Sequence, residues 1–192
     1  MSGADGETTW FETTDVSEVY DGFSTVRLER VRTPDGDEVE REIVVHDDAV
    51  AIVAIDDDAQ VVLLRQYRQS VRAYLLEVPA GKLDVEGEEP RDAAQRELAE
   101  EVGLQAGTLQ HLTTFHNSAG WTTEVTHVYL GRGLRSVDRP EGFEPKAEEL
   151  DMEIVQLPLA AAAAAARDGR ITDSKTVIGL LLACHELGIA PS

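Results

Sequence analysis

The sequence has little cysteine, little lysine and no long apolar run. Its single cysteine, Cys184, excludes an intramolecular disulfide. Because Cys184 stands in the apolar stretch 177–187, we expect it to be a small core residue. No apolar stretch approaches the roughly 20 residues that span a bilayer, and the first twenty residues are acidic. We therefore expect a cytoplasmic protein without a signal peptide or membrane anchor.

Positive charge is also scarce. The chain holds 17 basic residues, of which only Lys82, Lys146 and Lys175 are lysines, against 37 acidic residues and a net charge of −20. Such an acidic surface keeps a protein soluble in concentrated salt, so the composition favours a halophile over an ordinary acidic protein. It argues against nucleic acid as a partner, because phosphate contacts need a basic face. A small anionic substrate requires a metal or local arginines that invert the sign at its site.

The length of 192 residues and the 42% hydrophobic share suit one domain with a small N-terminal addition. Strands around the turn 34–37 predict an N-terminal β-hairpin at 24–31 and 39–46. The other predicted strands cover 49–55, 61–67, 74–78, 110–115, 125–130 and 152–157. Helices are predicted at 90–103, 160–167 and 174–187, the second as an alanine-rich surface helix. Strands interrupted by helices predict an α/β (α+β) sandwich.

Three glutamates stand out in the first predicted helix. Residues three and four apart share a helix face, so Glu97, Glu100 and Glu101 fall on one patch. Like charges at this spacing oppose helix formation by about 0.2–0.5 kcal/mol per pair, and a cation between them reverses the sign. Mg²⁺ takes oxygen ligands and combines a few carboxylates with substrate phosphates. The alternative in so acidic a chain is a solvated helix face.

The register around these glutamates is specific. From Glu88 the chain has seven residues, Arg96-Glu97, an aliphatic residue, any residue, Glu100-Glu101, any residue, Gly103 and an aliphatic residue. This order resembles the Nudix box, and every fixed position from Glu88 to Leu104 matches. One departure precedes the helix, where six residues rather than the usual five separate Gly81 from Glu88. A match of this length is stronger than a lone short motif.

The resemblance extends beyond the box. The segments 65–68 (Arg-Gln-Tyr-Arg), 77–81 (Glu-Val-Pro-Ala-Gly) and 171–176 are similar to the ADP-ribose pyrophosphatase branch of the Nudix hydrolases. This similarity implies a Nudix-type α/β/α sandwich with a mixed sheet. It also implies an N-terminal hairpin region, 1–47, that contributes to a homodimer, followed by a Nudix hydrolase domain, 48–192.

The same resemblance implies the site residues. The metal ligands for Mg²⁺ or Mn²⁺ are the Ala80 carbonyl and the carboxylates of Glu97, Glu100 and Glu101. Of these, Glu100 and Glu101 also count as catalytic. The remaining box residues have structural roles: Glu88 and Arg96 as an ion pair that pins the loop, with Gly81 and Gly103. A water-activating base is expected on a late loop as Glu148 or Glu149, which the sequence does not separate from each other or from a solvated acidic loop.

Substrate contacts are expected elsewhere in the chain. Arg68 is a candidate clamp for a phosphate, since guanidinium binds phosphate in a fork, and its alternative is a surface strand arginine. Glu124 matches a loop glutamate that touches substrate or metal in relatives. Phe23 and Trp121 are candidates for stacking on a base, or else simple packing residues. Ala119 replaces a proline that the branch usually carries, which leaves the exact substrate open.

The function that follows is Mg²⁺-dependent hydrolysis of the pyrophosphate of a nucleoside diphosphate linked to a sugar. The resemblance favours ADP-ribose, giving AMP and ribose 5-phosphate. One alternative is hydrolysis of another nucleoside diphosphate sugar or of an ADP-containing coenzyme. The other is a Nudix-fold sensor that binds ADP-ribose without cleaving it, against which the intact Glu97, Glu100 and Glu101 argue.

Overall fold

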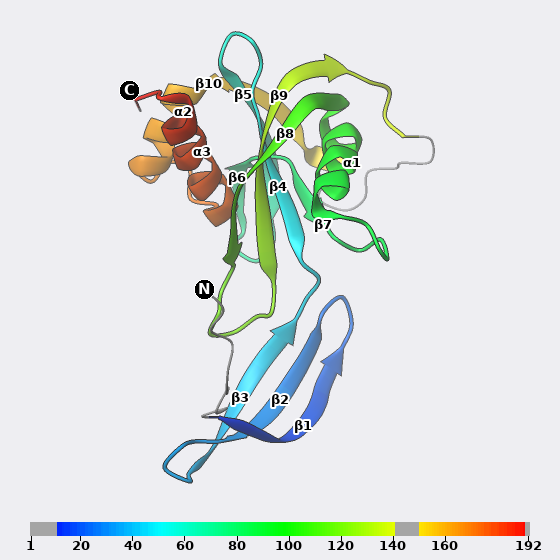
Figure 1. Cartoon of the computed structure of the whole chain (residues 1–192), viewed down its shortest axis with the longest axis vertical. Coiled ribbons are helices and arrows are strands. Elements are labelled where there is room, and N and C mark those ends of the chain that lie inside the picture. Colours follow the sequence, from blue (N-terminus) through cyan, green and yellow to red (C-terminus); the bar gives the residue numbers. More distant parts are fainter. Residues whose placement is uncertain (1–10, 141–149, 191–192) are drawn as a thin grey trace, which may run out of the picture. The chain divides into compact units, whose positions relative to one another are not determined.

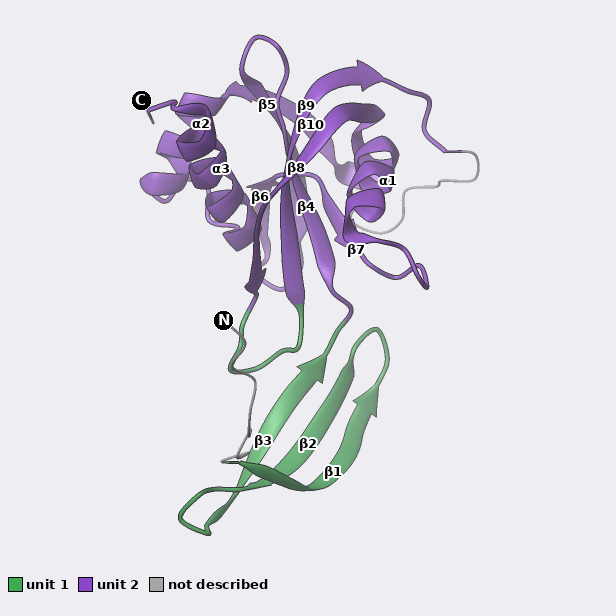
Figure 2. Ribbon diagram, viewed as in Figure 1, with its two compact units in different colours: residues 1–46, 118–124 green, residues 47–117, 125–192 purple. Residues whose placement is uncertain are grey.

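The computed structural model describes residues 11–140 and 150–190 and divides the chain into two compact units (Figure 2). Unit 1 is Met1–His46 with Ser118–Glu124, and unit 2 is Asp47–Asn117 with Val125–Ser192. The loop residues 118–124, which the sequence linked to substrate, thus cluster with the N-terminal strands. The two predicted candidates for the base, Glu148 and Glu149, lie outside the described residues.

Unit 1 contains an antiparallel sheet in the order β1-β2-β3 (Figure 1). Strands β2 (Thr25–Arg32) and β3 (Glu38–Val45) form the predicted hairpin, and Gly36 supplies the positive φ of 92° that its turn requires. Strand β1 (Glu12–Asp21) adds a third strand that the sequence did not indicate. Every residue of β1 is exposed and its register shifts twice, so it carries no regular alternation.

Unit 2 holds two further sheets. One has the order β7-β4-β9-β8 and the other β10-β5-β6. The pairing of β4 with β9 is parallel and the other pairings are antiparallel, which makes the first sheet mixed, as predicted. Their bounds are β4 Ala49–Ala54, β5 Gln60–Arg68, β6 Ala73–Glu77, β7 Ala80–Lys82, β8 Leu104–His116, β9 Val125–Ser136 and β10 Glu153–Pro158.

Helices cover both faces of these strands, with α1 (Pro90–Val102) on one side and α2 (Leu159–Arg167) and α3 (Ser174–Leu187) on the other (Figure 1). Strand β4 is buried on both faces, as its continuous apolar run predicted. Its Val50 and Ile52 pack with α1, while Ala51 and Val53 pack with α2 and α3. This is the predicted α/β/α sandwich.

The alanine-rich helix differs from its prediction as a surface helix. Ala162–Ala166 are buried in α2, which packs against the buried residues of α3. Helix propensity reports only that alanine forms a helix and carries no information about which faces are covered. Cys184 of α3 is buried as predicted. Within the described ranges, no helix has the length and apolar character needed to cross a membrane.

Candidate metal and substrate site

Helix α1 is held in place by local signals at both ends. Pro90 occupies its first turn, and Gly103 ends it with a left-handed φ of 64°. Ala94 and Leu98 anchor one face of the helix in the core. Strand β8 begins directly after Gly103, so the orientation of α1 follows from the sheet, and its glutamates are presented beside strand β7.

Two of the three glutamates lie against the short strand β7. The Oε2 atom of Glu101 accepts a hydrogen bond of 2.9 Å from the Ala80 N–H. The Glu97 carboxylate lies over Gly81, where a Cβ built on this glycine would overlap the carboxylate carbon and both oxygens. Gly81 is therefore needed for the close approach of Glu97, a reason that the loop spacing alone did not reveal.

Arg96 contacts three carboxylates, those of Glu88, Glu97 and Glu100. Its guanidinium donates to Glu88 at 2.9 Å (Nη2–Oε2), which is the predicted ion pair, and to the Lys82 carbonyl at 3.1 Å. The Nη1 atom of Arg96 also donates to Glu97 at 2.7 Å and to Glu100 at 3.1 Å. Hydrogen bonding to Glu88 is the largest cause of a raised pKa of Arg96. Arg96 thus connects the loop to the helix and neutralises part of the glutamate charge.

The buried environment disfavours charge on Glu97 and Glu101. Burial is the main reason that the pKa of Glu97 rises to about 7, against the lowering effect of Arg96. Burial likewise raises the pKa of Glu101 to about 8, against the hydrogen bond from Ala80. Two carboxylates that are largely shielded from water, Glu97 being buried and Glu101 half-buried, are unfavourable when ionised side by side, and a cation is one group that would offset this cost.

The donor set fits a hard divalent cation. It consists of carboxylate oxygens and a backbone carbonyl, and the side chain that is missing at Gly81 leaves a cradle for the Glu97 carboxylate. In the structure these carboxylates have protein partners: Glu97 and Glu100 accept hydrogen bonds from Arg96, and Glu101 accepts one from the Ala80 N–H. Among the described residues, no three His, Cys, Asp or Glu side chains are gathered as a ready-made metal site. Metal binding by these glutamates therefore stays a prediction.

Arg68 has a partner that the sequence did not suggest. It lies half-exposed on β5 and makes a two-pronged ion pair with Glu77 of β6, with Nε–Oε1 and Nη2–Oε2 both at 2.7 Å. Glu77, only 2% exposed, also accepts from Lys175 Nζ at 2.6 Å. Burial opposes ionisation of Glu77, but hydrogen bonds and charges from Arg68 and Lys175 prevail and lower its pKa to about 2.

This lowered pKa predicts a specific acid sensitivity. The pKa of Glu77 is near 4.5 when unfolded and about 2 when folded, so its stabilisation is present above pH 4.5 and lost as the pH falls toward 2. We expect this loss to be roughly 2 kcal/mol, less than the pKa difference alone would give because the half-exposed Arg68 is screened by solvent. Urea unfolding at pH 7, 4.5 and 3 would measure it.

In Glu77→Gln the pH dependence over this interval should be shallower by that amount. Glu153→Gln is the matched control, because Glu153 is an exposed carboxylate with a 3.5 Å ion pair to Arg65 in the same unit. Equal slopes for wild type and Glu77→Gln would contradict the assignment.

The other predicted substrate residues lie in unit 1. The Glu124 carboxylate is 3.8 Å from His46 Nδ1, and the ring of His46 is 5.8 Å from that of Phe23. Phe23 and Trp121 are 83% and 57% exposed, so neither is a core packing residue. Exposed aromatic rings can stack on a flat ligand. His46, to which the sequence assigned no role, joins Phe23 and Glu124 in one cluster.

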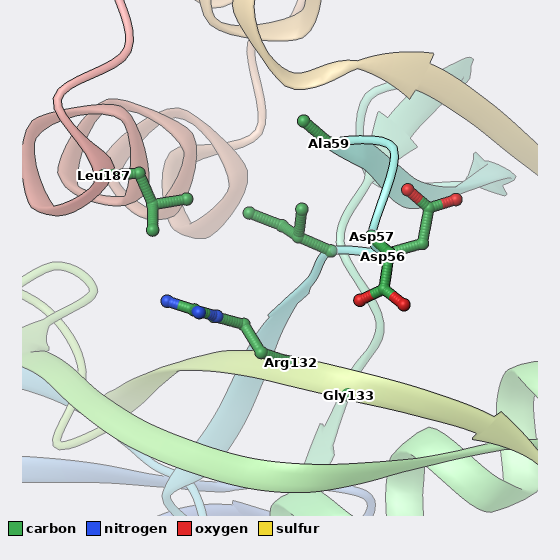
Figure 3. Close-up of a pocket in the computed structure, with 7 residues that line it drawn as sticks. Asp56, Asp57, Ala59, Arg132, Gly133 and Leu187 are labelled. Atoms are coloured by element: carbon green, nitrogen blue, oxygen red, sulfur yellow. The ribbon is translucent and has the colours of Figure 1, made fainter.

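A pocket of about 230 Å³ lies in unit 2 (Figure 3), and none of Glu97, Glu100 and Glu101 lines it. Figure 3 shows Asp56 and Asp57 on one side of it and Arg132 and Leu187 on others. None of the residues predicted for the site lines this pocket. The site on α1 and β7 therefore remains the candidate for chemistry.

An α/β/α sandwich that sets buried and half-buried glutamates of one helix beside the short strand following Pro79 is the architecture expected of a Nudix protein. The model of the family described as NUDIX domain matches residues 45–174. The chain is 44% identical over 172 residues to an "ADP-ribose pyrophosphatase" of Mycobacterium tuberculosis, covering 89% of this chain and 82% of that protein. The chain belongs to the NUDIX domain family.

Two further similarities agree with this family. A "Methanol dehydrogenase activator" of Bacillus methanolicus is 36% identical over 155 residues, covering 81% of this chain and 82% of that protein. A crystal structure described as an ADP compounds hydrolase has a TM-score of 0.82 at 26% identity, covering 96% of this chain and 97% of that one. The predicted fold is thus confirmed over nearly the whole chain.

Proposed function

We propose that the protein hydrolyses the pyrophosphate bond of ADP-ribose, giving AMP and ribose 5-phosphate, with Mg²⁺ as cofactor and Mn²⁺ as a substitute. The observation that carries the proposal is the placement of the Glu97 and Glu101 carboxylates against Ala80 and Gly81. The similarity to an ADP-ribose pyrophosphatase over 89% of the chain supports this substrate. The acidic chain needs such a site, because it would otherwise repel an anionic substrate.

The proposed roles follow from the contacts. Glu97, Glu100 and Glu101, with the Ala80 carbonyl, would hold the cation, which supplies charge neutralisation of the pyrophosphate and a more acidic bound water. Arg96 orients Glu97 and Glu100 by donating to both. The ion pair of Arg96 with Glu88 fixes the loop before the helix. This division of work leaves the box arginine in a positioning role.

The proposal also assigns the residues that contact the substrate and the residue that activates water. Arg68 would donate to a substrate phosphate. The exposed rings of Phe23 and Trp121 would stack on the nucleobase of the substrate, and Glu124 would contact the substrate. The general base that activates water is proposed to be Glu148 or Glu149. Replacing each by Gln tests the base, and a loss of kcat below about tenfold for both would contradict it, since acid–base catalysis contributes roughly 10²–10⁴-fold.

A homodimer is proposed from unit 1. Its strand β1 and the following turn expose large apolar side chains, with exposed fractions of 51% for Val16, 60% for Val19, 61% for Tyr20 and 83% for Phe23. Exposed apolar patches commonly mark interaction surfaces. The molar mass in solution, measured by light scattering at low and high salt, tests this assembly, and a monomer in both conditions would contradict it.

A second candidate function keeps the chemistry and changes the substrate. The similar crystal structure is described as a hydrolase of ADP compounds, a wider class than ADP-ribose. Ala119 stands where the predicted branch has proline, and it lies in the exposed loop 118–120. An ADP-containing coenzyme or another nucleoside diphosphate sugar is therefore the alternative substrate.

The decisive experiment is a substrate panel. Purified protein is given ADP-ribose, ADP-glucose, GDP-mannose and NADH with Mg²⁺, at low and high salt, and phosphatase-coupled phosphate release is measured. We expect ADP-ribose to have the highest kcat/KM and EDTA to abolish turnover, with recovery on addition of Mg²⁺ or Mn²⁺. Preference for another compound would establish the alternative. Binding of ADP-ribose without hydrolysis of any compound would make the protein a sensor and contradict the proposal.

A further inference from the structure

A compact cluster of four charged side chains lies where β5 and β6 meet the start of α3. The buried Glu77 carboxylate accepts two hydrogen bonds from Arg68 and one from Lys175. Lys175 Nζ also donates to Asp173 Oδ1 at 2.8 Å. Two cations and two carboxylates give the cluster no net formal charge. Unlike most ion pairs among the described residues, the Lys175 pairs join side chains that are 16% exposed or less.

The cluster is continuous with the N-terminus of α3. The second carboxylate oxygen of Asp173 caps the helix by accepting from the Thr176 N–H at 3.0 Å and from its hydroxyl at 2.6 Å. The same hydroxyl oxygen accepts the Val78 N–H at 2.9 Å. Val78, the residue after β6, is thus hydrogen-bonded to Thr176 of α3, which is 98 positions further along the chain.

Val78 is two residues from Ala80, whose N–H donates to Glu101. The segment 77–80 is therefore fixed at three points: by Glu77 in the cluster, by Val78 on Thr176 and by Ala80 on Glu101. Because only Val78 and Pro79 separate Glu77 from Ala80, a shift of Glu77 would be passed along this short segment to Ala80. The cluster also holds Arg68 through Nε and Nη2, and no acceptor among the described residues occupies its Nη1.

We propose that Glu77 and Lys175 are positioning residues of the site on α1 and β7. They hold the segment 77–80 so that Ala80 faces Glu101, and they hold Arg68 with Nη1 directed away from Glu77. The kinetic consequences of this inference rest on the proposed function. Its structural consequences do not. Buried ion pairs contribute little net stability compared with apolar packing, whereas in some proteins they fix a single arrangement.

The test replaces Lys175 by Met, which keeps the stem and removes the charge. Amide hydrogen exchange of the metal-free protein reports the local effect directly. We expect the Val78 and Ala80 amides to exchange about tenfold or more faster, while Leu180 and Ala183 in the buried part of α3 keep their rates. Lys175→Arg should restore slow exchange, because it keeps the charge and the donors.

The matched control is Arg170→Met, which removes one cation from the exposed 2.7 Å pair with Asp168 nearby in the sequence. It should change none of these rates. Should Lys175→Met leave the Val78 and Ala80 rates unchanged, or accelerate all four amides equally, the positioning role is overturned and Lys175 is a stability element. Thr176→Val, which removes the acceptor of the Val78 N–H, gives a second route to the same local exchange.

The kinetic arm uses hydrolysis of ADP-ribose by the same variants. In Lys175→Met we expect the Mg²⁺ concentration for half-maximal activity to rise about tenfold, with recovery in Lys175→Arg and no change in Arg170→Met. An unchanged value would overturn the link between the cluster and the site. If the wild-type protein cleaves nothing, the proposed function fails, while hydrogen exchange still decides whether Glu77 and Lys175 position Ala80.

Discussion

We expect Glu101→Gln to lower kcat for ADP-ribose by about 10²–10³-fold while stabilising the metal-free protein. The loss follows because Gln provides one neutral oxygen in place of a carboxylate. Removing even an outer-shell partner of a metal costs roughly 10–100-fold, and a direct ligand should cost more. The Ala80 N–H keeps an acceptor, since the Gln carbonyl can take the place of Oε2.

The stability effect has the opposite sign. Burial raises the pKa of Glu101 to about 8, so the folded metal-free protein pays for ionising this group above the unfolded pKa of 4.5. A neutral Gln removes that cost at high pH. We expect the Tm of Glu101→Gln in EDTA at pH 9 to exceed that of wild type, at about 2–4 °C for each kcal/mol relieved.

Addition of Mg²⁺ should reverse the order. A ligand that binds only the folded state raises Tm, and the wild type should gain more than Glu101→Gln. Glu89→Gln serves as the control, because Glu89 precedes the same helix, is exposed and makes no capping bond with its side chain. Equal Mg²⁺-induced shifts in wild type and Glu101→Gln, or a kcat within tenfold of wild type, would show that Glu101 does not bind the metal.

Prediction from the sequence succeeded where the signal is local. Helix α3 has its predicted bounds, 174–187, and local groups fix them in the structure: Asp173 caps its start and Gly188 ends it with a φ of 65°. Strands β4 and β5 were visible as short apolar runs, which suit strands that are buried between two layers. The register of the glutamates on α1 is likewise contained within one helix.

The missed strands depend on pairing at long range. Strand β7 is three residues long and follows Pro79, so no strand was predicted there, yet it is extended because it pairs with Ala49–Ala51 of β4. Strand β1 pairs with β2 but exposes all ten of its residues, so no apolar alternation marks it. Strand formation of this kind is decided by the neighbouring strand rather than by residue type.

The same distinction applies to the site. Nothing local joins Glu77 to Lys175, which are 98 positions apart, and each could have been a solvated surface charge. One signal was nevertheless present. In a chain with three lysines, Lys175 stands at the start of an apolar helix pattern, where a solvated lysine has no evident use. Scarcity of a residue type makes each remaining position of that type more informative.

Gly81→Ala should have the second large effect, through Glu97 alone. The added Cβ would overlap the Glu97 carboxylate, which must then leave β7 or push the strand away from α1. We expect the free energy of unfolding to fall by about 1–3 kcal/mol, as in other overpacked sites, and kcat/KM to fall by about 10²-fold or more. Urea unfolding and ADP-ribose hydrolysis at saturating Mg²⁺ measure the two effects.

Two further variants separate the clash from a general effect of the substitution. Gly107→Ala places a Cβ 3.2 Å from the Gly133 carbonyl oxygen, a contact that a small shift relieves, so its activity should stay near that of wild type. In Gly81→Ala combined with Glu97→Ala the overlapping carboxylate is gone, so the unfolding free energy should recover relative to Gly81→Ala while activity stays lost. If the unfolding free energy does not recover in the double variant, or if Gly81→Ala is fully active, Glu97 does not need the space that Gly81 leaves.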